Sequence, residues 1–188
     1  MIVKEYHKKG DRTQRFRILL DEHPEDPWRA FDHYTEVIHC HSRYEFDGES
    51  QGDQEFVQAE AIAVRKAGGA VLPLFLYEHG NSVLATEPFS CPWDSGQIGY
   101  AVIRKEVIDK DFEGKVELAE ACIRAEIQTL SQYWNGEVYG WAYVELEECS
   151  CCGVESEDVG DSCWGFYGAD FENMLSDAGF NPDEWEEA

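Results

Sequence analysis

Residues 115–146, KVELAEACIRAEIQTLSQYWNGEVYGWAYVEL, hold the clearest helix of the chain and, directly after it, its clearest strand. Apolar side chains recur every three to four positions up to Trp134, which predicts a helix over 115–134. Asn135 and Gly136 end that helix. From 138 to 146, aromatic residues alternate with small or aliphatic ones, as in a strand that is covered on both sides.

The rest of the chain interleaves strand and helix patterns. Asp53 is placed to cap a helix that runs to Ala67, where Gly68-Gly69 supplies a left-handed stop. A last helix is expected between Asp170 and Gly179. Strands are predicted at 12–20, 33–46, 70–77, 82–86, 97–103 and 161–168, with Pro73 pushing its strand toward an edge or a bulge. The sequence therefore predicts an α+β fold, with a mixed, mainly antiparallel sheet and two or three helices packed on one face, in a single domain over 1–188.

The charge of the chain is concentrated at its C-terminal end. The formal net charge is -24, and residues 137–188 hold fifteen Asp or Glu but no Lys or Arg. Ten Lys or Arg lie in residues 1–67, so the chain is a dipole. An acidic surface repels nucleic acid and anionic lipid, and it attracts proteins whose basic surfaces bind phosphate.

Composition also bounds the setting of the protein. The chain has 188 residues, 43% of them hydrophobic, which is enough to build a sizeable core. No stretch approaches the roughly 20 apolar residues of a membrane span, and the N-terminus has no apolar signal core. Seven cysteines cannot all pair within one chain, and most stay reduced in a reducing compartment. We therefore expect a cytoplasmic protein without a membrane partner.

Cysteines and histidines supply candidates for a metal site. Cys149 and Cys152 form a Cys-x-x-Cys-Gly element of the kind that begins many zinc knuckles. A closed structural site needs four ligands, so Cys163, Cys91 or a histidine would have to complete it. His33, His39 and His41 share a predicted strand face, which is the weaker alternative. The simpler interpretation is a reduced acidic loop, and no cofactor is expected.

The loop 88-PFSCPWDSGQIGY-100 is the densest in unusual residues. One interpretation makes Cys91 a nucleophile, with His79 or another histidine as base and Asp94 as orienting group, but the sequence does not show that arrangement. The structural interpretation fits better. Asp94 and Ser95 would bond the turn, Gly96 would take a positive φ and Trp93 would anchor the packing.

Three ordered motifs resemble those of a family of small acidic proteins from phages and other mobile elements. They are the loop at 88–100, the segment 132-QYWNGEVYG-140 and the segment 161-DSCWGFYG-168, which includes Ser162 and Trp164. The resemblance covers residues 70–178 and leaves residues 1–50 outside. This chain departs from the pattern by inserting the acidic, cysteine-rich segment 149–159.

The resemblance implies a counter-defence context, but no established activity. Small acidic proteins of mobile elements often occupy the nucleic-acid groove of a restriction enzyme or CRISPR effector. We therefore expect inhibition of a basic host nucleic-acid-binding protein, by nucleic-acid mimicry and without direct contact to nucleic acid. The acids expected to bind that partner are Glu145, Glu147, Glu148, Glu155, Glu157, Asp158, Asp161, Asp170, Glu172 and Asp177. Two alternatives stay open, namely a binding or assembly protein without mimicry and a small cysteine-dependent enzyme; acidic surfaces are also commonly just solvated faces.

Overall fold

The computed structural model describes residues 1–46 and 50–188, and it divides the chain into two compact units. The terminal unit contains residues 1–24 and 136–188, and the central unit contains residues 25–135. The α+β class with mainly antiparallel sheets is confirmed. The sequence predicted one sheet, whereas in the described residues each unit has its own five-stranded sheet.

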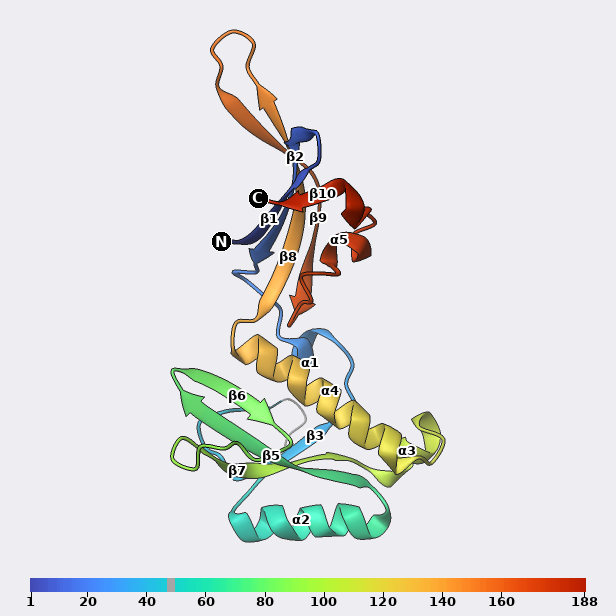
Figure 1. Cartoon of the computed structure of the whole chain (residues 1–188). Coiled ribbons are helices and arrows are strands. Elements are labelled where there is room, and N and C mark those ends of the chain that lie inside the picture. Colours follow the sequence, from blue (N-terminus) through green and yellow to red (C-terminus); the bar gives the residue numbers. More distant parts are fainter. Residues whose placement is uncertain (47–49) are drawn as a thin grey trace. The chain divides into compact units, whose positions relative to one another are not determined.

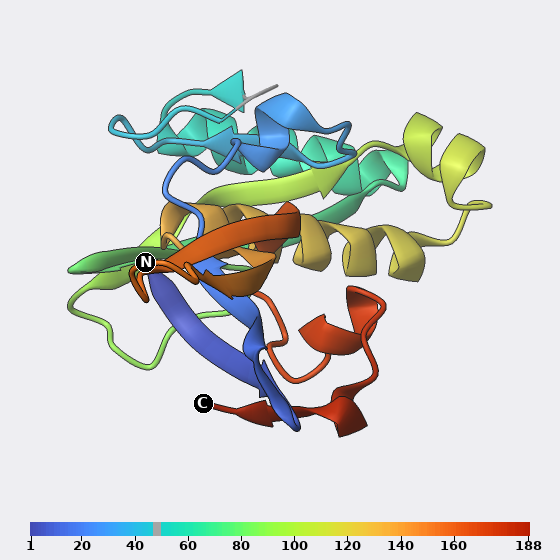
Figure 2. The ribbon, with the colours of Figure 1, turned by 90° about the horizontal axis from the view of Figure 1, so that it is seen from above.

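The terminal unit joins the two ends of the chain in one sheet, which both views show (Figures 1 and 2). Its strand order is β10-β1-β2-β8-β9, and all neighbours are antiparallel. The strands are β1 (Ile2–Lys8), β2 (Asp11–Leu20), β8 (Val138–Glu148), β9 (Glu155–Tyr167) and β10 (Trp185–Glu187). A one-turn helix, α5 (Met174–Asp177), and a 3-10 turn (Pro182–Glu184) precede β10.

Aromatic side chains build the core of the terminal unit on one face of its sheet. Phe16 stacks on Trp141 at 5.5 Å between ring centroids, and Phe180 and Trp185 meet Phe16 edge-on. Met174 of α5 is buried in the same cluster. Because side chains alternate along each strand, the odd-numbered residues of β8 up to Tyr143 face this core, and the even-numbered ones lie on the opposite face.

The central unit has the strand order β4-β3-β7-β5-β6. Its strands are β3 (Glu36–His39), β4 (Ser50–Gln51), β5 (Ala70–His79), β6 (Asn81–Ala85) and β7 (Ser95–Ile103), and its helices are α1 (Pro27–Ala30), α2 (Gln54–Ala67), α3 (Lys105–Asp111) and α4 (Val116–Trp134). β3 and β4 are parallel and the other neighbours are antiparallel. Helix α4 packs on one face and α2 on the other, so the helices cover both faces of this sheet (Figure 1).

Several local predictions for the central unit are confirmed. The Asp53 carboxylate accepts a hydrogen bond from the Phe56 amide and caps α2, and Gly68 ends the helix at φ 93°. Pro73 lies in the first part of β5, before the strand begins to pair with β6 at Phe75. The pairing of β5 with β7 shifts register just after Pro73, between Leu74 and Phe75. A proline is tolerated there because one side of the strand needs no amide donor.

The strand predicted over 33–46 is wrong in its length. β3 ends at His39, where Gly99 of β7 approaches so closely that a β-carbon on it would lie 2.1 Å from the Ile38 carbonyl oxygen. Beyond that point the chain leaves the sheet, and His41 stacks on Tyr44 within the following loop. In the sequence, polar and apolar residues continue to alternate past the end of β3, because side chains of the following loop are packed as well. The alternation therefore predicted too long a strand.

Candidate functional site on the acidic hairpin

The acidic segment of the chain forms a β-hairpin that extends past the sheet of the terminal unit (Figure 1, orange). β8 and β9 pair from Val138 and Tyr167 out to Glu148 and Glu155. The neighbouring strand β2 accompanies β8 only as far as Glu145. The predicted insertion at 149–159 is therefore not a loop throughout, because its residues from Glu155 onward belong to β9.

The ten acids predicted to bind a partner are all exposed, but they do not line one face of the hairpin. Strand alternation places Glu145, Glu147, Asp158 and Asp161 on the side of the sheet that carries the aromatic core, and Glu148, Glu155 and Glu157 on the other side. The remaining three, Asp170, Glu172 and Asp177, lie in and before α5. The Asp170 carboxylate accepts hydrogen bonds from the Glu172 amide and the Asn173 side chain. The helix predicted between Asp170 and Gly179 begins only at Met174.

Two pairs of like charges stand directly opposite each other across the hairpin. Glu145 faces Asp158, and Glu148 faces Glu155. Side chains in such positions have β-carbons about 5 Å apart, and like charges there destabilise the pairing. Among the described residues, Glu148, Glu155 and Asp158 form no salt bridge that would relieve this repulsion. The hairpin therefore carries an unfavourable electrostatic term that a cationic partner would remove.

Glu157 is an exception, since it is not available as a free acid. Its carboxylate accepts two hydrogen bonds from the Arg17 guanidinium, at 2.7 and 2.8 Å. Arg17 of β2 is largely buried and also contacts Glu5. The guanidinium lowers the pKa of Glu157, and the hydrogen bonds to Glu157 and Glu5 raise the pKa of Arg17 despite the opposing effect of burial. Glu157 thus ties the base of the hairpin to the sheet, a role that the acidic pattern alone did not indicate.

Apolar side chains share the face that carries Glu148, Glu155 and Glu157. Val159 is 57% exposed and Trp164 is 48% exposed. Trp164 lies flat on Gly140 of the neighbouring strand, where a β-carbon would come within 2.2 Å of the indole ring. The ring of Trp164, a residue of the third sequence motif, is therefore itself part of the surface. Asp161 and Ser162 lie in β9, paired with Tyr143 and Ala142, and the Ser162 amide donates a hydrogen bond to the Asp161 carboxylate.

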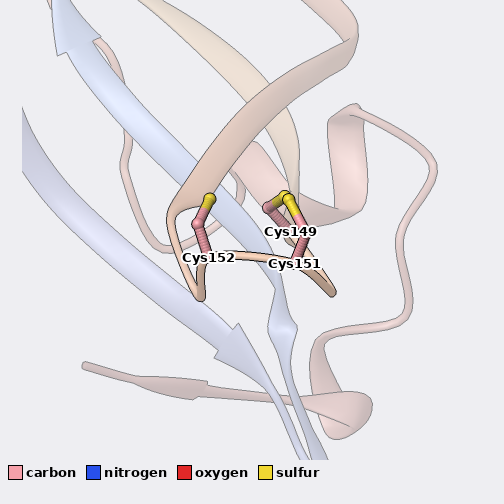
Figure 3. Close-up of side chains that lie close together, drawn as sticks. All are labelled: Cys149, Cys151 and Cys152. Carbon is pink, nitrogen blue, oxygen red and sulfur yellow. The ribbon is translucent and has the colours of Figure 1, made fainter.

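Three cysteines meet at the tip of the hairpin. Cys149, Cys151 and Cys152 are exposed, and their sulfur atoms lie within 4.8 Å of one another (Figure 3). Sequence spacing pointed to Cys149 and Cys152, whereas the structure adds Cys151, whose sulfur is 2.9 Å from that of Cys149. Hydrogen bonds from the thiol and amide of Cys151, and then from those of Cys152, lower the pKa of Cys149 to about 6. Cys163, a predicted fourth ligand, pairs with Trp141 farther down the strand.

The loop around Cys91 belongs to the central unit. Asp94 bridges two of the residues considered for catalysis, with its Oδ2 atom 3.5 Å from the Cys91 sulfur and 3.4 Å from His79 Nδ1. A nucleophile and its base must contact each other directly, with the carboxylate behind the base. Here the carboxylate stands between the thiol and the imidazole, which is not the order of a catalytic triad.

The structural roles predicted for this loop are confirmed only in part. The Ser95 hydroxyl donates to the Cys91 carbonyl and fastens the turn. Trp93 is 91% exposed, so its prediction as a packing anchor is wrong. Gly96 lies inside β7, paired with Leu76, and does not take the predicted positive φ. Apolar character alone does not tell whether a loop tryptophan packs inward.

The histidines considered as metal ligands occupy separate aromatic contacts. His33 stacks on Trp28 at 4.7 Å, and the buried His39 meets Phe46 edge-on at 5.0 Å. His41 lies beyond the end of β3. Packing against aromatic rings accounts for these histidine side chains. In the part of the chain that the structure describes, the side chains grouped closely enough to hold a metal ion are the three tip cysteines.

Comparison with protein-family models, with curated proteins and with solved structures finds no match for this chain. The resemblance to acidic phage proteins therefore stays a prediction from the three sequence motifs. Within residues 1–46 and 50–188, no helix has the length and hydrophobicity needed to span a membrane.

Proposed function

We propose that this protein binds a basic nucleic-acid-binding protein through the acidic hairpin formed by residues 145–158, and that it competes there with nucleic acid. The observation that carries the proposal is charge density. Five carboxylates, at positions 145, 147, 148, 155 and 158, lie on four cross-strand residue pairs and are not bound by Arg17. Four residues at a rise of about 3.3 Å each take up about 13 Å of strand, which gives one free carboxylate per about 2.6 Å, counted over both faces of the hairpin. This density is of the same order as that of duplex DNA, which carries one charge per about 1.7 Å of its axis.

Partial preorganisation supports the same proposal. The strand pairing and the Arg17–Glu157 ion pair hold the base of the hairpin before any partner arrives. A paired hairpin loses less affinity to ordering than a flexible acidic tail does. Release of the like-charge repulsion at Glu148 and Glu155 adds to the favourable free energy of binding a cationic surface.

The exposed apolar residues beside the acids add a second source of affinity. Val159 and Trp164 lie on the same face as Glu148 and Glu155. Tryptophan is enriched among the residues that dominate binding energy at interfaces, whereas exposed charges mainly set specificity and association rate. The partner surface is therefore expected to combine Lys or Arg with an apolar patch.

In the context that the sequence motifs suggest, the partner is a restriction enzyme or a CRISPR effector in the cytoplasm of a host cell. A panel of such purified enzymes tests this in DNA-cleavage assays at low and high salt. The wild-type protein should inhibit at least one of them, and the inhibition should weaken as salt rises, because charge pairing is screened. A variant with Glu147→Gln, Glu148→Gln, Glu155→Gln and Asp158→Asn should not inhibit.

A matched control removes four exposed carboxylates from the central unit: Glu55→Gln, Glu87→Gln, Glu106→Gln and Glu117→Gln. It changes the net charge by the same amount and should inhibit like the wild type. Equal inhibition by both variants would show that overall charge or another surface is responsible. Absence of inhibition across the panel would remove the anti-defence context.

A further inference from the structure

The turn at the tip of the hairpin brings three thiols to one side of the chain. The Gly153 amide donates to the Cys149 carbonyl at 2.8 Å, and the Cys149 amide donates to the Val154 carbonyl at 2.9 Å. Gly153 adopts φ 68°, a conformation that glycine takes without strain. Figure 3 shows the side chains of Cys149, Cys151 and Cys152 rising from this turn with their sulfur atoms on the same side.

The spacing of the sulfur atoms suits a metal ion. Tetrahedral bonds of about 2.3 Å to zinc place two thiolates about 3.8 Å apart. The three sulfurs lie within 4.8 Å of one another, and those of Cys149 and Cys151 are 2.9 Å apart, so small side-chain rotations bring all three to bonding distance. Thiolates select soft ions such as Zn²⁺ and Cu⁺ over Mg²⁺ or Ca²⁺, which the surrounding carboxylates alone would favour.

A metal would also solve a stability problem of the hairpin. Beyond Glu145, β8 and β9 form an isolated two-stranded ribbon, and such ribbons are marginal in water. The like-charge pair Glu148 and Glu155 adjoins the tip and weakens it further. A cation bound by Cys149, the residue directly after Glu148, would offset that repulsion and close the turn.

We propose that Cys149, Cys151 and Cys152 together bind one thiophilic d10 metal ion, with Zn²⁺ and Cu⁺ as the candidate ions. Each thiol enters the site as a thiolate and releases its proton to solvent, and no electron is transferred. Three protein ligands complete a trigonal Cu⁺ site and leave one position of a tetrahedral Zn²⁺ site for water. The proposal is independent of the function of the acidic surface.

The test uses the full chain, reduced with a phosphine under nitrogen and freed of metal by a chelator. Zn²⁺ and, separately, Cu⁺ are added, and native mass spectrometry counts the ions bound per chain. One ion per chain is expected with at least one of the two metals. Each of the variants Cys149→Ser, Cys151→Ser and Cys152→Ser should weaken binding at least about 100-fold in competition with a chromophoric chelator. Cys163→Ser, on the same hairpin, should bind like the wild type.

Two further measurements keep the result separate from folding and from oxidation. Far-UV circular dichroism should show that the serine variants fold, because the tip is exposed. Hydrogen exchange at residues 146–157 should slow when the metal binds. The proposal is overturned if the reduced chain takes up neither ion, or if the triple serine variant binds metal as tightly as the wild type. It is also overturned if Cys163→Ser weakens binding as much as the tip variants do. A Cys149–Cys151 disulfide that the phosphine does not reduce, found by mass spectrometry, would overturn it as well.

Discussion

The guanidinium of Arg17 and the carboxylate of Glu157 form a two-pronged ion pair, with nitrogen–oxygen distances of 2.7 and 2.8 Å. Arg17 lies in the second strand of the chain and Glu157 lies 140 residues later. Among the described residues, Arg17 provides the salt bridge that ties the acidic hairpin to the sheet. The basic N-terminal strands and the acidic C-terminal segment are thus two halves of one sheet.

Replacement of Arg17 should therefore loosen the hairpin. Arg17→Met leaves Glu5 and Glu157 without their shared partner, and we expect a loss of about 2 kcal/mol of unfolding free energy, below the value for a fully buried pair because Glu157 is half exposed. Urea unfolding measures the loss. Arg12→Met removes the same charge from an exposed position and should change stability by less than about 0.5 kcal/mol. An equal effect of both substitutions would assign the loss to net charge.

The same ion pair predicts how stability depends on pH. Arg17 holds the pKa of Glu157 below its ordinary value of 4.5, and the hydrogen bonds from Arg17 and His7 likewise lower that of Glu5, against the opposing effect of burial. The stabilisation is complete above pH 4.5 and is lost as the pH falls through the lowered values, because the folded state then takes up protons at greater cost than the unfolded chain. Thermal unfolding between pH 6 and 3 should show a shallower decline in Arg17→Met. Parallel declines would rule out this pair as the cause.

A close approach of two strands fixes the exposed indole of Trp164. A β-carbon on residue 140 would collide with the ring, so Gly140→Ala should displace Trp164 and cost about 1–3 kcal/mol. The cost should shrink in the double variant with Trp164→Ala, because the colliding ring is then absent. Additive effects in this cycle would mean that the glycine serves the backbone alone. Gly96→Ala, where the space is open, is the control.

The like-charge pair at Glu148 and Glu155 predicts opposite effects on stability and on binding. Glu155→Lys converts the repulsive pair into an attractive one and should raise the unfolding free energy by about 0.2–1 kcal/mol. It should at the same time weaken inhibition of the partner. Residue 147 faces Ser156 instead of an acid, so the control substitution Glu147→Lys should weaken inhibition without the gain in stability. A loss of stability in Glu155→Lys would contradict the pairing across the hairpin.

Local signals in the sequence predicted much of the fold. Asp53 and Gly68 mark the ends of α2, and the apolar stripe of α4 marks its buried face, because these signals depend on neighbouring residues only. The pairing of β1 with β10 was missed, since Trp185–Glu187 is short and charged and its partner lies at the far end of the chain. Long-range pairing also decides that the chain has two sheets in place of one.

The candidate site was predicted in composition but not in geometry. The acids are exposed as expected, yet strand alternation divides them between two faces, and Arg17 occupies Glu157. Cys151 was missed because the Cys-x-x-Cys spacing points only to Cys149 and Cys152. The turn at Gly153 brings the sulfur atoms of all three cysteines together, and the spacing does not show that turn.

Competition with DNA tests the central claim most directly. A restriction enzyme or CRISPR effector that the protein inhibits is immobilised, the wild-type protein is bound at low salt, and duplex DNA is titrated in. We expect DNA to displace the protein competitively, and we expect the variant with Glu147→Gln, Glu148→Gln, Glu155→Gln and Asp158→Asn to bind at least about 10-fold more weakly, a difference that shrinks as salt rises. Simultaneous binding of DNA and protein, or undiminished binding of this variant, would contradict the account.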